Sequence, residues 1–203
     1  LVNLHTWYKN KEFTPVVAVG SGYSARSHFD GQDFLESGKN KIDHNSGWLA
    51  RAIEIKSKKA LAVSQSTPIS LRGSDNVNTW YPSNLKESGD DIYDQLAKLY
   101  KDDDVLLSRL QEGLETKSIA EMGKESKKKG TFKDLTSSCA KLLTAENGAD
   151  CAMLELGGWD THNNQAGRLH RKLTELDEGL ANLKKMLGDT WKDTPVVIAT
   201  EFG

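Results

Sequence analysis

The sequence predicts an α/β fold in which a mostly parallel sheet is flanked by helices. In the C-terminal third, an apolar run over residues 151–156 is followed by a helical pattern over 163–187 and a second apolar run over 195–200. Because a long amphipathic helix carries the chain back across a sheet, we expect these two strands to be parallel. A third run, Pro15 to Gly20, is β-branched and ends in glycine, which is typical of a buried strand.

Length and composition exclude several classes of protein. The chain has 203 residues, which suits one domain. No apolar run approaches the roughly 20 residues of a membrane-spanning helix, so this segment contains no membrane span. The net charge is -2, and the main basic cluster, residues 124–129, contains no aromatic residue. Nucleic-acid binding is therefore not supported.

Both ends of the chain suggest a piece of a larger domain. The sequence begins at Leu1 with neither an initiator methionine nor a targeting segment, and it ends three residues after the apolar run that closes at Thr200. We expect residues 1–203 to be a single α/β domain fragment. Its start therefore says nothing about a signal peptide in the parent protein.

The helices are predicted from caps and leucine spacing. Ser27 can cap a helix that runs to about Ser37, and residues 60–71, with Pro68 near their end, form a strand followed by a loop. Residues 88–130 form a helical excursion whose two helices are separated by aspartates 102–104, and residues 117–130 form an exposed loop. Thr131 then starts a helix with five inward residues: Phe132, Leu135, Cys139, Leu142 and Leu143. The helix over 163–187 carries a stripe of six leucines at three- and four-residue spacing: 169, 173, 176, 180, 183 and 187.

The two cysteines allow two interpretations. Cys139 and Cys151 are 12 positions apart, at a helix end and at the start of the next strand. They are close enough in sequence to form a disulfide in an oxidising compartment. Two unrelated small core residues are the alternative.

Polar side chains follow three of the predicted strands. They occupy residues 21–30 after the first, residues 157–162 after the second, and Glu201 after the last. In an open parallel sheet, ligands bind at the carboxyl ends of the strands. We therefore expect Ser27, Asp160, His162 and Glu201 to converge at one edge of the sheet.

Asp160 and His162 are candidate metal ligands. Glycines 157 and 158 let the backbone turn sharply, and the two side chains follow at the mouth of the next helix. A carboxylate oxygen with an imidazole nitrogen favours a divalent metal such as Zn²⁺ or Mn²⁺. Glu201 is a third candidate ligand. The alternative is that Asp160 caps the helix while His162 and Glu201 are solvated.

Ser27 at a helix N-terminus is a candidate nucleophile, because free amides and the helix dipole favour an anion there. An ordinary capping serine is the alternative. A triad of Ser27, His28 and Asp30 is disfavoured, because neighbours in a first helical turn pair poorly. The Gly-x-Gly-x-x-Ala pattern at residues 20–25 raises dinucleotide binding, but no acidic residue ends a second strand about 20 positions later.

Four segments together resemble a known family. The segments AVGSGYSARSHFDGQDFLESG, GWLARAI, ELGGWDTHNNQ and VVIATEFG occur in this order. They are similar to the exported domain-of-unknown-function family numbered 1501, of the alkaline-phosphatase-like, sulfatase-like superfamily. The resemblance covers most of the chain and is weakest over residues 56–129.

The resemblance implies an alkaline-phosphatase-like fold and an exported or periplasmic location. It implies a catalytic nucleophile at Ser27, with Arg26 and His28 binding substrate. It also implies a divalent metal, Zn or Mn, held by Asp160, His162 and Glu201. Phe202 stands where many relatives have an imidazole, so a complete two-metal site is in doubt.

Two functions follow from this interpretation. The first is a metal-dependent hydrolase-like domain that acts on phosphate or sulfate esters. The second is a non-catalytic exported or surface protein that kept the fold. The sequence leaves the oligomeric state open.

Overall fold

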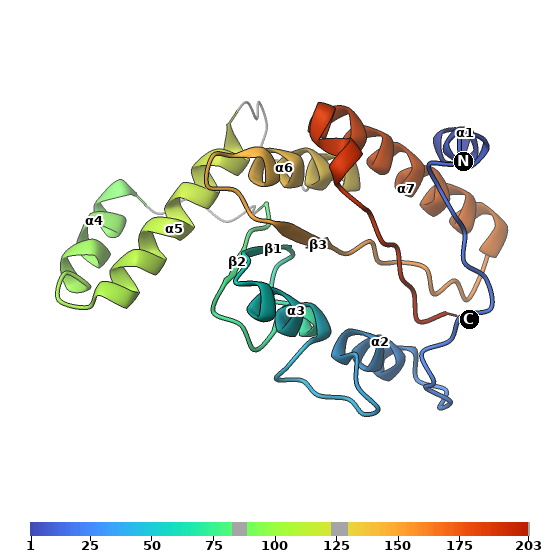
Figure 1. The fold of residues 1–203 in the computed structure, drawn as a ribbon, viewed down its shortest axis with the longest axis horizontal. Helices are drawn as coiled ribbons and strands as arrows, with labels where there is room; N and C mark the ends of the chain where they lie inside the picture. Colours follow the sequence, from blue (N-terminus) through green and yellow to red (C-terminus); the bar gives the residue numbers. More distant parts are fainter. Residues whose placement is uncertain (83–88, 123–129, 203) are drawn as a thin grey trace.

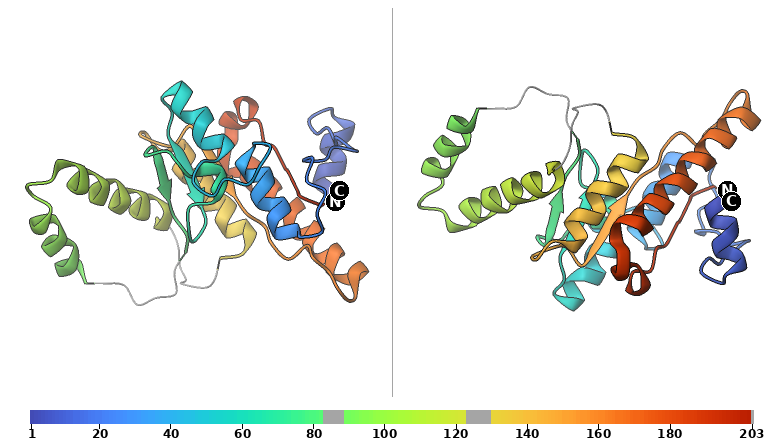
Figure 2. Two further views of the ribbon diagram at one scale, coloured as in Figure 1. Left: turned by 90° about the horizontal axis from the view of Figure 1, so that it is seen from below. Right: turned by 90° about the horizontal axis from the view of Figure 1, so that it is seen from above.

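The computed structural model describes residues 1–82, 89–122 and 130–202, which form an α/β protein (Figures 1 and 2). In chain order the elements are α1 (Val2–Lys9), α2 (His28–Ser37), α3 (Trp48–Lys56), β1 (Ala60–Val63), the 3-10 helix η1 (Ile69–Leu71), β2 (Val77–Thr79), α4 (Asp90–Leu99), α5 (Asp104–Glu121), α6 (Phe132–Thr144), β3 (Cys151–Leu154), α7 (Gln165–Leu187) and the 3-10 helix η2 (Gly188–Asp193).

The sheet has three parallel strands in the order β2-β1-β3. Ala60 of β1 lies opposite Val77 of β2 on one side and Cys151 of β3 on the other. A parallel sheet and the strands within 60–71 and 151–156 are as predicted, but β3 pairs with β1 and not with the run over 195–200. β2 was not predicted, because its three residues, Val-Asn-Thr, are too few to show a period.

Two predicted strands are wrong. Residues 15–20 and 195–200 are extended, but neither run forms a backbone hydrogen bond with another described residue. Their valines face solvent, with Val17 and Val197 each 82% exposed. Residues of high β-propensity form strands only where a neighbouring edge pairs with them. The sheet described here ends at β2 and β3, so these runs remain outside it.

The sheet separates two apolar clusters because successive side chains of a strand point to opposite faces. Leu61 and Val63 pack with α6 and α7, whereas Ala60 and Ala62 pack with α3 and η1. Figure 1 shows α6 and α7 on one side of the strands and α2 and α3 on the other. The core is therefore a three-layer arrangement of helices, sheet and helices.

The predicted cysteine pair is separated by the sheet. Cys139 of α6 is buried in the cluster on one face, and Cys151 of β3 packs against the cluster on the other. Both thiols are free. Burial raises the pKa of Cys139 to about 12, so this thiol stays protonated. The structure favours the interpretation of two unrelated core residues.

The core on the first face depends on the contact between α6 and α7, the most extensive between helices. Of the six predicted leucines, Leu180, Leu183 and Leu187 are buried, and the other three are half-buried. Gly179 faces Phe132 so closely that a Cβ at this glycine would lie 2.2 Å from the ring. The absence of a side chain at Gly179 allows the two helices to approach.

The helix α1 is held against α7 by polar contacts. Asp177 accepts hydrogen bonds from the backbone amides of Asn3 and Leu4, at 3.1 and 2.8 Å. This carboxylate satisfies amides that a helix N-terminus leaves unpaired. Farther along, the Lys184 ammonium lies 5.0 Å from the ring of Trp7, which packs against Trp191.

The predicted helical excursion is the pair α4 and α5, separated at residues 100–103. Asp103 caps α5 by accepting a hydrogen bond from the Leu106 amide. The expected loop over 117–130 is wrong for its first five residues, because α5 continues to Glu121. Residues 123–129, including the basic cluster 124–129, lie outside the described residues. No helix in the described part of the chain is long and apolar enough to cross a membrane.

Replacing Gly179 with alanine should destabilise the protein by about 1–3 kcal/mol, because the Phe132 ring must move. The control is Gly113→Ala in α5, where a Cβ meets nothing within 4 Å. There alanine should stabilise by about 0.5–1 kcal/mol through helix propensity alone. Urea unfolding measures both changes. Stabilisation by both substitutions would contradict the close packing of α6 on α7.

Replacing Asp177 with asparagine should loosen α1. In the wild type, burial opposes ionisation, but the hydrogen bonds from Leu4 and Asn3 outweigh it and hold the pKa of Asp177 below its usual value of 3.8. The stability that the ionised Asp177 carboxylate contributes is complete above pH 3.8 and is lost as the pH falls through the lower folded-state pKa.

Amide hydrogen exchange of residues 2–9 and Trp7 fluorescence should therefore show α1 detaching in acid in the wild type. The same signals should show α1 already loose at neutral pH in Asp177→Asn. Equal protection of α1 in both proteins at pH 7 would show that the carboxylate does not hold it.

Candidate functional site

The first part of the site is the N-terminus of α2. As predicted, Ser27 caps this helix, because its Oγ accepts a hydrogen bond from the Asp30 amide at 3.2 Å. The other free amides of the first turn add a positive partial charge at the same place. Arg26 is exposed and forms no hydrogen bond or ion pair with another described residue. Its guanidinium is therefore free to meet a ligand.

The second part is the loop that follows β3. Gly158 adopts a φ of +87°, a conformation that side chains rarely tolerate, so the predicted sharp turn is located there. Beyond the turn, Asp160 Oδ2 lies 2.8 Å from His162 Nε2. The His162 side chain is 84% exposed, so this pair is open to solvent. A carboxylate and an imidazole thus meet next to α2.

His28 joins the two parts of the site. Its Nε2 lies 3.5 Å from Asp160 Oδ2, and its Nδ1 lies 3.6 Å from Glu201 Oε1. The imidazole is packed between Phe29, at 4.0 Å between ring centroids, and Phe202, stacked at 5.6 Å. His28 Nδ1 is buried and has no hydrogen-bond partner among the described residues. The imidazole is thus held by aromatic packing between two carboxylates.

The structure brings together the side chains expected at one edge of the sheet. Asp160 contacts His162 directly, and Asp160 and Glu201 both contact His28. Ser27 precedes His28 in the chain and lies at the same helix end. Sequence reasoning missed that His28 links the carboxylates and that Phe202 stacks on it. The only available signal was the position of His28 after the capping serine, which does not reveal where an imidazole points.

The donor atoms suit a divalent metal in type but are not gathered around one point. Two ligands of a tetrahedral Zn²⁺ lie about 3.3 Å apart, given bonds of about 2.0–2.1 Å. The separations of 3.5 and 3.6 Å join each carboxylate to His28, whereas the predicted ligands Asp160 Oδ2 and His162 Nε2 lie 2.8 Å apart, which is hydrogen-bond distance. Within residues 1–82, 89–122 and 130–202, no three His, Cys, Asp or Glu side chains form a group that could hold one ion.

A polar network lies behind the site and ties α2 to the end of β3. Gln32 Nε2 donates to Glu36 at 2.9 Å and to Glu155 at 3.1 Å. Glu36, which is buried, also accepts a hydrogen bond from the Ser70 amide at 3.0 Å. Burial and the nearby Glu36 raise the pKa of Glu155. The position of His28 therefore depends on this network as well as on its own contacts.

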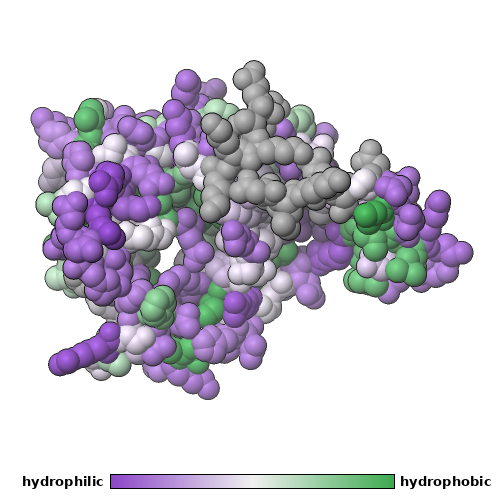
Figure 3. Space-filling model, turned by 180° about the vertical axis from the view of Figure 1, so that it is seen from behind, coloured by the Kyte–Doolittle hydropathy of each residue, from purple (hydrophilic) through white to green (hydrophobic). Residues whose placement is uncertain are grey.

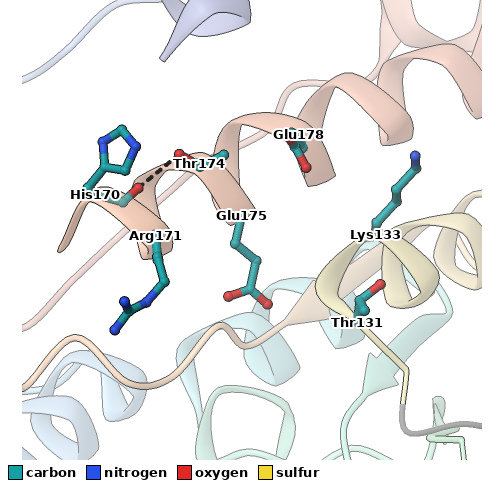
Figure 4. A pocket seen from close by; sticks show the side chains of 7 residues that line it. All are labelled: Thr131, Lys133, His170, Arg171, Thr174, Glu175 and Glu178. Carbon is teal, nitrogen blue, oxygen red and sulfur yellow. Dashed lines mark hydrogen bonds between the residues drawn. The ribbon is translucent and has the colours of Figure 1, made fainter. Parts of the chain in front are cut away.

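A hollow in the described structure lies elsewhere. It has a volume of about 500 Å³, and Figure 4 shows its seven lining side chains on α6 and α7: Thr131, Lys133, His170, Arg171, Thr174, Glu175 and Glu178. Glu175 is paired with Lys172, and the Thr174 hydroxyl donates to the His170 carbonyl. None of the predicted site residues lines this hollow, so the hollow is separate from the site predicted from the sequence.

The fold and the site define a class: an α/β protein with a parallel sheet whose polar loops converge at a helix N-terminus. Within that class, residues 15–203 match the model of the family described as protein of unknown function (DUF1501), and the chain belongs to this family. The helix α1 lies outside the matched range. No curated protein and no solved structure matches the chain.

Replacing Gly158 with alanine should destabilise the protein by about 1–2 kcal/mol, the cost of a left-handed conformation for a residue with a side chain. The nearby Lys172 side chain is flexible at its end and adds little. Gly157→Ala is the matched control, because its Cβ meets nothing within 4 Å. Urea unfolding should show the larger loss for Gly158→Ala. Equal losses would contradict the role of Gly158 in placing Asp160.

Proposed function

We propose that this chain is a metal-dependent, hydrolase-like domain of the alkaline-phosphatase-like type that acts on phosphate or sulfate esters. One observation carries the proposal: Asp160 and Glu201 each contact His28, and His162 contacts Asp160, at the N-terminus of the helix that Ser27 caps. Nothing in the packing of a core requires this convergence, because these side chains come from three separate segments. Membership in a family of unknown function is compatible with the proposal.

Ser27 is the proposed nucleophile. Its Oγ would form a bond to phosphorus or sulfur while the ester bond to the leaving alkoxide breaks, and water would take the serine proton and protonate the alkoxide. A second water would then release phosphate or sulfate. The free amides of α2, together with Arg26 and His28, would bind the oxygens of the anionic group.

A divalent ion, Zn or Mn, would be held by Asp160 and His162, with Glu201 as the third ligand. Such an ion supplies positive charge that stabilises the anionic nucleophile and the substrate oxygens. Residues of this chain would position the ion. Asp160 and His162 are already in contact, and Phe202 and Phe29 pack against the His28 ring.

A non-catalytic protein that retained the fold is the second candidate. The observation that favours it is Phe202, whose ring stacks on His28 where a second imidazole would complete a two-metal site. In either case we propose an exported or periplasmic location, which rests on the resemblance of the sequence to its family.

Hydrolysis of p-nitrophenyl phosphate and p-nitrophenyl sulfate, with Zn²⁺ or Mn²⁺ added, tests the catalytic proposal. We expect Ser27→Ala to lose at least about 10²-fold in rate, because it removes the nucleophile. Asp160→Ala should lower both the rate and the metal affinity measured by isothermal titration. Ser24→Ala, in the exposed loop before the helix, is the matched serine control and should leave both unchanged.

The outcomes separate the two candidates. Metal binding that depends on Asp160, together with hydrolysis that depends on Ser27, supports the enzyme. Metal binding without hydrolysis of either ester favours the non-catalytic protein. Metal binding that is unaffected by Asp160→Ala would refute the assigned ligands.

A further inference from the structure

The helices α4 and α5 form an arm that projects from the body, as both views of Figure 2 show. Among the described residues, no side chain of α4 is buried, and in α5 only Thr116 and Ala120 are buried, near the body. The helix α4 contacts α5 through Tyr93, whose ring centroid lies 5.4 Å from the Lys117 ammonium, and among the described elements it has no extensive packing partner. The arm therefore contributes little to the core.

The arm nevertheless carries the apolar pattern of packed helices. Ile92, Leu96 and Leu99 follow the i, i+4, i+7 spacing of one face of α4. Around the turn between the helices, Leu99 is 73% exposed and Val105 is 70% exposed, and Leu106 is also exposed. Figure 3 shows apolar side chains on the projecting arm, beside hydrophilic ones at its end. We call Leu99, Val105 and Leu106 the tip patch.

The charge of the arm indicates what could cover the tip patch. Residues 90–121 contain nine acidic and four basic side chains, a net charge of -5, whereas the other 171 residues contain 20 acidic and 23 basic ones, a net charge of +3. Asp102, beside the tip patch, is 87% exposed and forms a loose ion pair with Lys101 at 3.8 Å. An acidic rim around an apolar patch is complementary to a basic partner with an apolar stripe.

The same charge argues against pairing of two arms from two copies of this chain. Two arms of charge -5 would repel each other, and like charges brought together at an interface disfavour association. A basic amphipathic helix would not meet this repulsion. Its apolar stripe would lie across α4 and α5 as helix-in-groove complexes do, and its lysines would face the aspartates.

We propose that the α4–α5 arm is a docking surface for a basic amphipathic helix of another protein. The tip patch supplies the apolar contact, and the acidic rim supplies attraction and orientation. This docking surface is distinct from the proposed active site, because it uses none of the site's residues. Its success or failure is therefore independent of the proposed hydrolysis.

The test uses the full chain and two labelled synthetic peptides of about five helical turns. Both peptides carry leucines at i, i+3, i+4 and i+7, and their other positions are all lysine in one and all glutamate in the other. Fluorescence anisotropy should show at least about tenfold tighter binding of the lysine peptide, with weakening in high salt. The double variant Leu99→Ser and Val105→Ser should weaken that binding by at least about fivefold.

Two controls locate the binding. Ile55→Ser removes an equally exposed apolar side chain on α3, and Asp189→Asn removes a surface charge in η2. Both should change the affinity by less than about twofold. Asp102→Asn should weaken binding and reduce its salt dependence. Because all these side chains are exposed, the variants should fold, which circular dichroism verifies.

Three outcomes would overturn the proposal. The first is equal binding of the lysine and glutamate peptides, or no binding of either. The second is binding of the lysine peptide that survives Leu99→Ser and Val105→Ser. The third is a concentration-dependent dimer, seen by light scattering, that the double variant abolishes. That result would show that a second copy covers the tip patch.

Discussion

The contact of α7 with α6 fixes the geometry on which the candidate site depends. Gly179 lets α7 lie against Phe132, and the leucines of α7 then reach the cluster over the sheet. Asp160 and His162 precede this helix, and Glu201 follows it. A displacement of α7 would therefore move two of the three segments that meet at His28. Packing far from the site thus determines whether its side chains can meet.

The length of α7 also explains the extended run that follows it. At 1.5 Å per residue, its 23 residues advance the chain by about 35 Å away from the site. Glu201 can contact His28 only if the chain returns toward the start of α7, and residues 194–201 in extended form cover about 26 Å of that return. The run over 195–200 is therefore extended because it must reach the site, whether or not a neighbouring strand pairs with it.

The difference between an extended run and a paired strand shows what could and could not be predicted from the sequence. The long helix, the Ser27 cap and the strand at residue 151 come from local signals, namely leucine spacing, a capping serine and a short apolar run. Asp160 and Glu201 both contact His28, in line with the predicted convergence, but the premise of that prediction is wrong for Glu201, because residues 195–200 are extended without joining the sheet. Whether the valine-rich runs 15–20 and 195–200 pair with a strand could not be predicted, because hydrogen bonding to a neighbouring strand is not a property of either run alone. The orientation of the His28 ring depends on Phe29 and Phe202 in space.

The helix that carries Ser27 and His28 is positioned mainly by polar contacts. The buried residues of α2 are Gly31, Glu36 and Ser37, so little apolar burial holds it in place. At one end, His28 lies between two carboxylates, and at the other, Gln32 and Glu36 bind Glu155 and the Ser70 amide. Because burial and Glu36 raise the pKa of Glu155, its contribution to stability is present at low pH and is lost as the pH rises through the folded-state value. Directional hydrogen bonds set the orientation of α2 closely, while the apolar packing of α6 and α7 supplies the stability that this helix lacks.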